Sequence, residues 1–192
     1  MCCGMTNHSI HERQGLPTEM QILLRDYPRA AWPDHPNFAR SIRNWMGAHK
    51  MFRQLGELCR SDTEQYLDKN QDAGVYAGRL GHFGNLLVAN LHGHHTWEDR
   101  SFFPELQNAD SRFESGLNTL ESDHEVLDDV LQRFTNAANR VIKLVQLDEV
   151  QARNEAAELH GTSAEIERFL ARHLTDEEDL VVPILLHHKM RG

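Results

Sequence analysis

The stretch HHTWEDRSFFPEL, residues 94–106, occurs a second time in altered form as RHLTDEEDLVVPIL, residues 172–185. When Pro104 is aligned with Pro183, the two copies are 79 residues apart (183 − 104 = 79). The same offset aligns three further pairs: His94 with His173, Glu98 with Glu177, and Asp99 with Glu178. Each copy therefore reads His-x-x-x-Glu followed by an acid and, further on, by two apolar residues and a proline.

The spacing within each copy is that of two metal ligands on one helix. Positions i and i+4 share a face, with Cβ atoms about 5–6 Å apart, so an imidazole and a carboxylate can meet the same cation. A single such pair often makes only a surface hydrogen bond, but a duplicated pair in register is far more specific. The alignment selects His94 from its neighbours. His92 and His95 fall on Ala171 and Leu174, so we expect neither of them to bind metal.

Apolar residues at helical spacing fill four segments around these copies: 37–68, 72–106, 111–144 and 148–187. The breaks between them carry Asn, Asp and Ser, which cap helices, and no stretch has the alternating pattern of a strand. Short connections make consecutive helices antiparallel neighbours. We predict an all-α protein in which an antiparallel up-down-up-down four-helix bundle, residues 37–192, follows an N-terminal arm with a short helix, residues 1–36.

The first and third predicted helices each carry one histidine at a similar depth, His49 and His124. At about 1.5 Å per residue, each lies about 18–20 Å from the start of its helix. His94 and His173 lie ten residues before the prolines that mark the far ends of the other two helices. In an up-down bundle the four histidines then converge at one depth.

Four histidines and two glutamates form a nitrogen and oxygen site, which suits iron, manganese or zinc and not calcium or magnesium. Six ligands exceed the four of tetrahedral zinc. Two metal ions that share Glu98 and Glu177 as bridges would use this set better.

Composition and charge limit the class of protein, its partners and its cellular location. The 192 residues are enough for one domain, and no run of 18 apolar residues could span a bilayer. A net charge of −9 argues against nucleic acid or an anionic membrane as a partner. The first residues lack an apolar secretory segment, so we expect a cytoplasmic protein. Cys2, Cys3 and Cys59 have no spacing typical of disulfides or thiolate metal sites.

The pattern of His, His-x-x-x-Glu, His and His-x-x-x-Glu with the apolar-Pro ending resembles the hemerythrin-like (HHE cation-binding) domains, over about residues 37–188. The resemblance implies a left-handed four-helix bundle with two non-haem iron ions, or with zinc or manganese in their place. It implies six ligands: His49, His94, Glu98, His124, His173 and Glu177. Ferritin-like di-iron bundles differ, because their paired motif runs Glu-x-x-His.

The sequence departs from the oxygen-carrying hemerythrins at Asp128, where those proteins have a second histidine four residues after that of the third helix. They also end with a wider His–Asp pair, where this chain has His173 and Glu177. The loss of a histidine favours reaction with, or sensing of, dioxygen, peroxide or nitric oxide over reversible oxygen carriage. A di-iron oxidoreductase and an iron or oxygen storage module need the same ligands, so both remain open, and a zinc-stabilised structural bundle is the weakest alternative.

Asp128 and Arg53 lie four residues after His124 and His49, so we expect both side chains inside the bundle, one turn beyond these histidines. A buried carboxylate needs a metal, a proton or a cation. We expect Arg53 and Asp128 to pair and to support the ligands from outside. The alternative is that Asp128 ligates the second metal and Arg53 turns to solvent.

Overall fold

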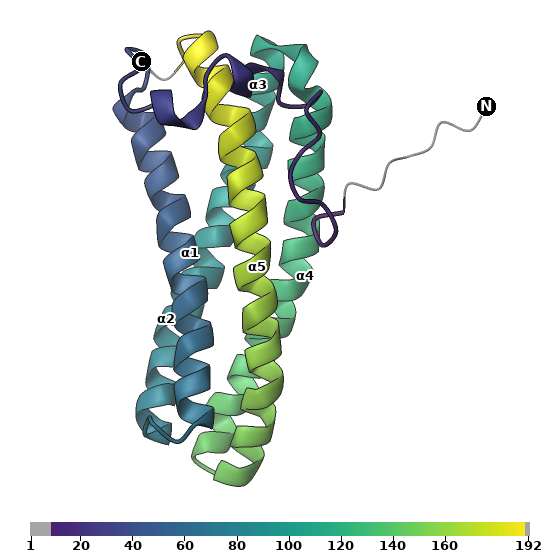
Figure 1. Ribbon diagram of the computed structural model, residues 1–192. Coiled ribbons are helices and arrows are strands. Elements are labelled where there is room, and N and C mark those ends of the chain that lie inside the picture. Colours follow the sequence, from purple (N-terminus) through teal and green to yellow (C-terminus); the bar gives the residue numbers. More distant parts are fainter. Residues whose placement is uncertain (1–8, 191–192) are drawn as a thin grey trace, which may run out of the picture.

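The computed structural model describes residues 9–190, and every regular element within that range is helical. The four long helices lie side by side, and the colours of Figure 1 show that consecutive ones run in opposite directions. They are α1 (Arg40–Leu67), α2 (Ala73–Trp97), α4 (Glu114–Val145) and α5 (Glu149–His187). Each packs against two neighbours, so that α1 and α4 both contact α2 and α5. The predicted all-α bundle is confirmed.

The second predicted helix is not continuous to its proline. α2 ends at Trp97 and passes into a π-helical turn, η3 (Glu98–Phe102), and then into the short helix α3 (Phe103–Ala109). Pro104 has no N–H to donate to the carbonyl four residues earlier, and its ring crowds that carbonyl. The backbone widens instead, and the Phe103 N–H bonds the carbonyl of Glu98. Turns of this kind are frequent at functional sites.

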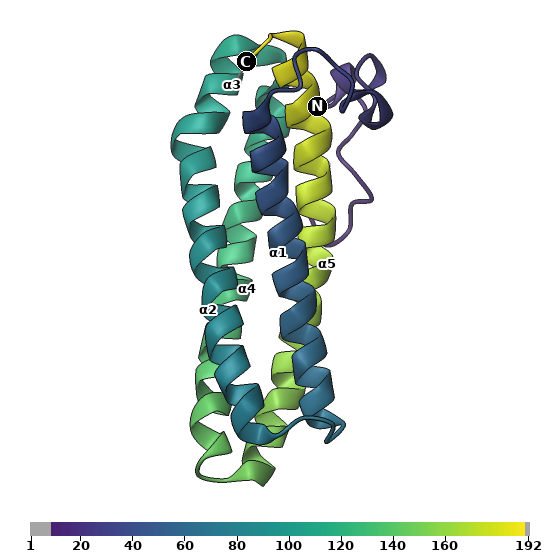
Figure 2. The same cartoon turned by 90° about the vertical axis from the view of Figure 1, so that its left-hand side faces the viewer.

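The segment before α1 packs along α5, as Figure 2 shows. Four of its apolar side chains are buried: Ile10, Leu16, Leu23 and Trp32. The short helix predicted there is a 3₁₀ helix, η1 (Ile22–Arg25), and a second short 3₁₀ helix, η2 (Arg29–Ala31), follows it. Prolines at 28, 33 and 36 explain why neither turn extends.

Two apolar cores divide the bundle, and a polar layer lies between them. On α1, for example, His49 lies between Trp45 of one core and Phe52 of the other. His124 lies in the same way between Leu120 and Leu127 on α4. The polar layer is therefore enclosed by apolar side chains on both sides along the bundle axis.

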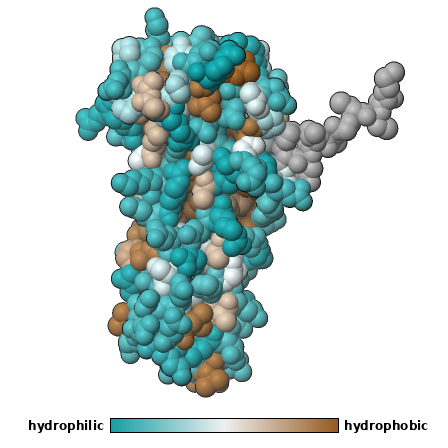
Figure 3. Space-filling model, viewed as in Figure 1, coloured by the Kyte–Doolittle hydropathy of each residue, from teal (hydrophilic) through white to brown (hydrophobic). Residues whose placement is uncertain are grey.

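The face seen in Figure 3 is mostly hydrophilic, as expected for helices that bury one side. Within residues 9–190, the helices are too short or too polar for any of them to cross a membrane. Cys59 is buried and unpaired, whereas Cys2 and Cys3 lie outside the described residues.

Candidate metal centre

The structure brings all six predicted ligands into the polar layer, where they form two adjacent groups. The first group contains His49, His94, Glu98 and Glu177, and the second contains His95, His124 and His173. Within each group the candidate ligand atoms all lie within 4.8 Å of one another. Each group could therefore hold one metal ion.

Glu98 and Glu177 link the two groups. Glu98 Oε1 lies 2.9 Å from His94 Nε2 in the first group, and its Oε2 lies 4.0 Å from His124 Nε2 in the second. Glu177 Oε2 lies 3.4 Å from His49 Nε2 and 3.9 Å from His173 Nε2. Both carboxylates are fully buried and come from opposing helices. Each carboxylate therefore lies within 4.0 Å of histidine nitrogens of both groups.

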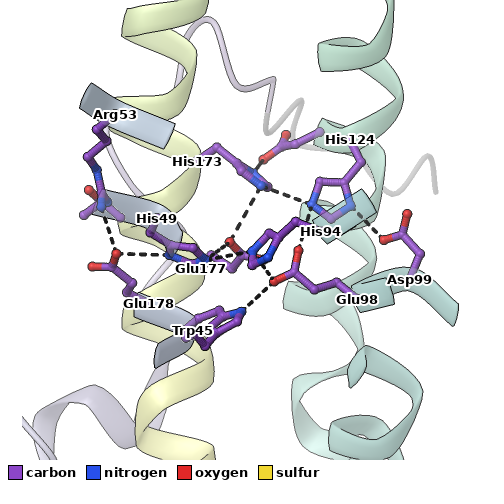
Figure 4. Close-up of polar contacts among 12 residues, drawn as sticks. Trp45, His49, Arg53, His94, Glu98, Asp99, His124, His173, Glu177 and Glu178 are labelled. Atoms are coloured by element: carbon purple, nitrogen blue, oxygen red, sulfur yellow. Dashed lines mark hydrogen bonds and ion pairs between the residues drawn. The ribbon is translucent and has the colours of Figure 1, made fainter. Parts of the chain in front are cut away.

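Three of the histidines turn Nε2 towards the centre of the site and contact a carboxylate through the second ring nitrogen, Nδ1 (Figure 4). The Nδ1 atoms contact an acid at 3.1 Å for His49, 2.7 Å for His124 and 3.1 Å for His173. The three acids are Glu178, Asp99 and Asp123 respectively. An Nδ1–H that donates to a carboxylate leaves the Nε2 lone pair free for a metal ion, an arrangement typical of metal-binding histidines.

The acid that follows each repeated glutamate now has a role. Asp99 follows Glu98 on η3 and bonds His124 of α4, while Glu178 follows Glu177 on α5 and bonds His49 of α1. In each copy of the repeat, one residue is a candidate ligand and the next orients a histidine on a neighbouring helix. The duplication therefore extends beyond the His-x-x-x-Glu pairs.

Burial favours the neutral form of three histidines, His49, His95 and His173, as metal binding requires. Burial lowers the pKa of His173 to about 4, despite its bond to Asp123. Burial also lowers the pKa of His49, and it lowers that of His95 well below its usual value. At neutral pH these rings have lone pairs available rather than a positive charge.

Several buried nitrogen and oxygen atoms in the layer lack a hydrogen-bond partner among the described residues. Neither oxygen of Glu177, nor Glu98 Oε2, nor either ring nitrogen of His95 has a hydrogen-bond partner among the residues the structure describes. His124 Nε2 and His173 Nε2 face each other at 3.1 Å, and both rings turn Nδ1 to a carboxylate. Two lone pairs at this distance repel unless a positive charge lies between them. Burial and the neighbouring Glu98 also raise the pKa of Glu177 well above its usual range. These residues fit a metal centre.

The hemerythrin HHE cation-binding domain model matches residues 40–185. The chain belongs to this family. No curated protein and no solved structure gives a match. The hemerythrin match covers both groups of candidate ligands, and it leaves out the segment before α1.

His95 lies beside His124 and His173 in the second group, a position that the repeat did not indicate. Its ring is buried and stacks on His124 at a centroid distance of 3.9 Å, and it meets His173 edge-on at 5.6 Å. His92, in contrast, is exposed and belongs to neither group. The centre therefore offers five imidazoles and two carboxylates rather than four and two.

Asp128 is not in the interior, and the predicted pair with Arg53 does not form. The Asp128 side chain is 55% exposed, with His92 Nδ1 3.9 Å from its Oδ1. Arg53 instead donates to Glu178 Oε1 at 3.0 Å, and so supports the acid that orients His49. Arg53 thus supports a candidate ligand from outside, as predicted, but its partner is Glu178 and not Asp128.

We expect Asp128→Asn to leave the centre unchanged. The side chain is exposed and belongs to neither group, so its neutralisation should change the free energy of unfolding by no more than about 0.5 kcal/mol. Metal-to-protein ratios and thermal unfolding midpoints of the variant and the parent test this. Loss of one metal equivalent would mean that Asp128 swings inward to bind the metal.

Proposed function

We propose that this protein is a non-haem di-iron protein of the hemerythrin type that reacts with or senses a small molecule, namely dioxygen, peroxide or nitric oxide. The observation that carries the proposal is that Glu98 and Glu177 reach both histidine groups at once. A closed tetrahedral zinc site takes four ligands, so it requires neither shared carboxylates nor a set of seven candidate ligands. A mixed nitrogen and carboxylate set of this size favours a pair of iron ions.

His49 and His94 would hold one ion, His95, His124 and His173 the other, and the two glutamates would contact both. Bound iron supplies a Lewis acid and a source of electrons for the small molecule. The protein would contribute imidazoles oriented by Glu178, Asp99 and Asp123, and a pair of buried carboxylates that balance the cationic charge. Proton release on metal binding is expected, because the raised pKa of Glu177 favours its protonated form before the metal arrives.

Aromatic rings around the histidines support a small ligand rather than a large substrate. Trp45 lies 4.2 Å from His49 and Phe52 lies 5.1 Å from His94, measured between ring centroids. Phe103 and Phe169 contact His124 and His173 at 5.8 and 5.7 Å. Such walls exclude bulk water from the centre. They suit a diatomic molecule or peroxide.

One observation supports a second candidate function, the reversible binding or storage of oxygen or iron without turnover. The sequence argument against oxygen carriage was the missing histidine at Asp128. His95 supplies a fifth imidazole from α2 instead of α4. The number of histidines therefore no longer argues against a carrier.

Metal analysis and absorption spectroscopy of freshly purified protein test both candidates. We expect two iron ions per chain and visible charge-transfer bands that change when oxygen, peroxide or nitric oxide is added to the reduced protein. Consumption of several equivalents of peroxide supports reaction, whereas recovery of the initial spectrum on removal of oxygen supports carriage. Zinc at one ion per chain with a featureless spectrum would contradict both.

A further inference from the structure

We infer that the segment before α1 helps to position the candidate metal ligands. Arg13 and Arg29 each bond an acid, and each of these acids orients one candidate ligand histidine, one in each group. The inference rests on the proposed metal-binding function. It concerns residues 9–39, which lie outside the region that matches the hemerythrin family.

Arg13 serves the second group. Its guanidinium bonds both oxygens of Asp123 and, through Nε at 2.8 Å, Asp176 Oδ2. Asp123 in turn contacts His173 Nδ1. The side chains of Arg13 and Asp123 are each 5% exposed and that of Asp176 is 2% exposed. A forked contact of this kind fixes the plane of a carboxylate as well as its charge.

Arg29 serves the first group. It donates from NH1 to Glu178 Oε2 at 2.8 Å and from Nε to Asp179 Oδ1 at 2.5 Å. Glu178 contacts His49 Nδ1 through its other oxygen, Oε1, which also accepts a bond from Arg53. Glu178 thus has two arginine partners, one from the segment and one from α1.

The two chains of contacts run from the segment to different groups: Arg13 through Asp123 to His173, and Arg29 through Glu178 to His49. Of the two acids, Glu178 belongs to the repeat, where it aligns with Asp99, and Asp123 lies outside both copies. Among the described residues, Asp123, which orients His173, is bonded by one arginine, Arg13. The His49 group keeps Arg53 if Arg29 is lost.

Removal of Arg13 leaves the buried Asp123 without its arginine, whereas Asp176 keeps its ion pair with Arg172. A buried charge that loses its partner seeks another donor or water, so Asp123 would no longer hold His173 in one orientation. Changes to residues that orient metal ligands typically weaken metal binding by about 10- to 100-fold. We expect a loss in that range for Arg13→Gln, confined to one of the two ions, and a smaller loss on the other ion for Arg29→Gln.

The experiment is a chelator competition with cobalt(II) on the full chain, read from the cobalt absorption bands. Arg25→Gln is the matched control, because Arg25 lies in the same segment, is 86% exposed and bonds only its neighbour Asp26 among the contacts described. Arg13→Lys keeps the charge but not the fork, and should recover part of the affinity. If Arg13 had a purely structural role, its loss would lower the affinity for both ions together, and Arg13→Lys would not recover part of that affinity.

A second measurement does not depend on metal. In the metal-free protein, the imidazole ¹⁵N resonances of His173 should change in Arg13→Gln and those of His49 in Arg29→Gln, with neither changed by Arg25→Gln. If the parent binds no cobalt, the proposed function fails and this inference fails with it. If the parent binds two ions and the Arg13 and Arg29 variants bind them with unchanged affinity and spectra, the inference alone is overturned.

Discussion

Replacing Glu177 by glutamine is expected to reduce bound metal from two ions per chain to fewer than one. Glu177 Oε2 lies within 4 Å of a histidine nitrogen in each group, so the change removes a ligand and a negative charge from both positions. Glutamine keeps the volume of the side chain, which separates loss of a ligand from loss of packing. Metal analysis after expression in iron-supplemented medium gives the ratio, with Glu158→Gln, an exposed change on the same helix, as the control.

In the metal-free protein, the same variant should make the free energy of unfolding less sensitive to rising pH. Burial and Glu98 raise the folded-state pKa of Glu177 above its ordinary value of 4.5. A group with a raised pKa stabilises the fold below its unfolded pKa, and this contribution is lost as pH rises through the folded pKa. Metal-free Glu177→Gln should therefore lose less stability than its parent as pH rises above about 4.5. A variant that still holds two ions would show that Glu177 is not a bridge.

The fold could be predicted because its signals are local. The apolar spacing and the capping residues between segments define the helices, and the repeated proline marks corresponding ends. The π-helical turn was not predicted, since Pro104 signals a disturbed helix without specifying its form. Pro183, at the aligned position, lies within α5 without a comparable turn.

His95 was missed because a repeat can reveal only what both copies share, and the second copy has Leu174 at that position. The inward face of α2 contained a better signal. At about 100° per residue, Leu87 and Leu91 point about 20° and 60° round from His94, towards His95 at about 100°. His94 and His95 thus flank the apolar arc of the helix, one facing α1 and the other facing α4 and α5.

The same reasoning explains Asp128. On α4 the buried residues Leu127 and Leu131 lie about 60° and 20° to one side of His124, whereas Asp128 lies about 40° to the other side. His124 is therefore near the edge of the inward arc, and Asp128 is beyond it. Spacing from a single ligand could not reveal this, but the centre of the apolar arc could.

The contacts of Arg13 and Arg29 could not be predicted from the sequence. They join residues more than 100 positions apart, and no periodicity marks them. The segment that carries them contains prolines and only short turns, so its path depends on packing against α5.

His95→Leu should remove the ion held by His95, His124 and His173 and leave the other, so that the metal-to-protein ratio falls from two to about one. Leucine already occupies the aligned position, 174, where it is buried in a helix of the same bundle, so the change should be tolerated. Without His95 the second group offers two imidazoles and shares both carboxylates with its neighbour. The first group keeps all four of its residues.

His92→Ala is the control for this last prediction, because His92 lies on the same helix, is exposed, and belongs to neither group. It should bind two ions with the affinity of the parent. Retention of two ions by His95→Leu, with an unchanged spectrum, would mean that the centre needs only the six ligands suggested by the repeat. The His95 nitrogens, which have no hydrogen-bond partner among residues 9–190 and are buried against two candidate ligands, argue for the opposite result. A buried polar group without a partner costs about 1–3 kcal/mol unless something binds it.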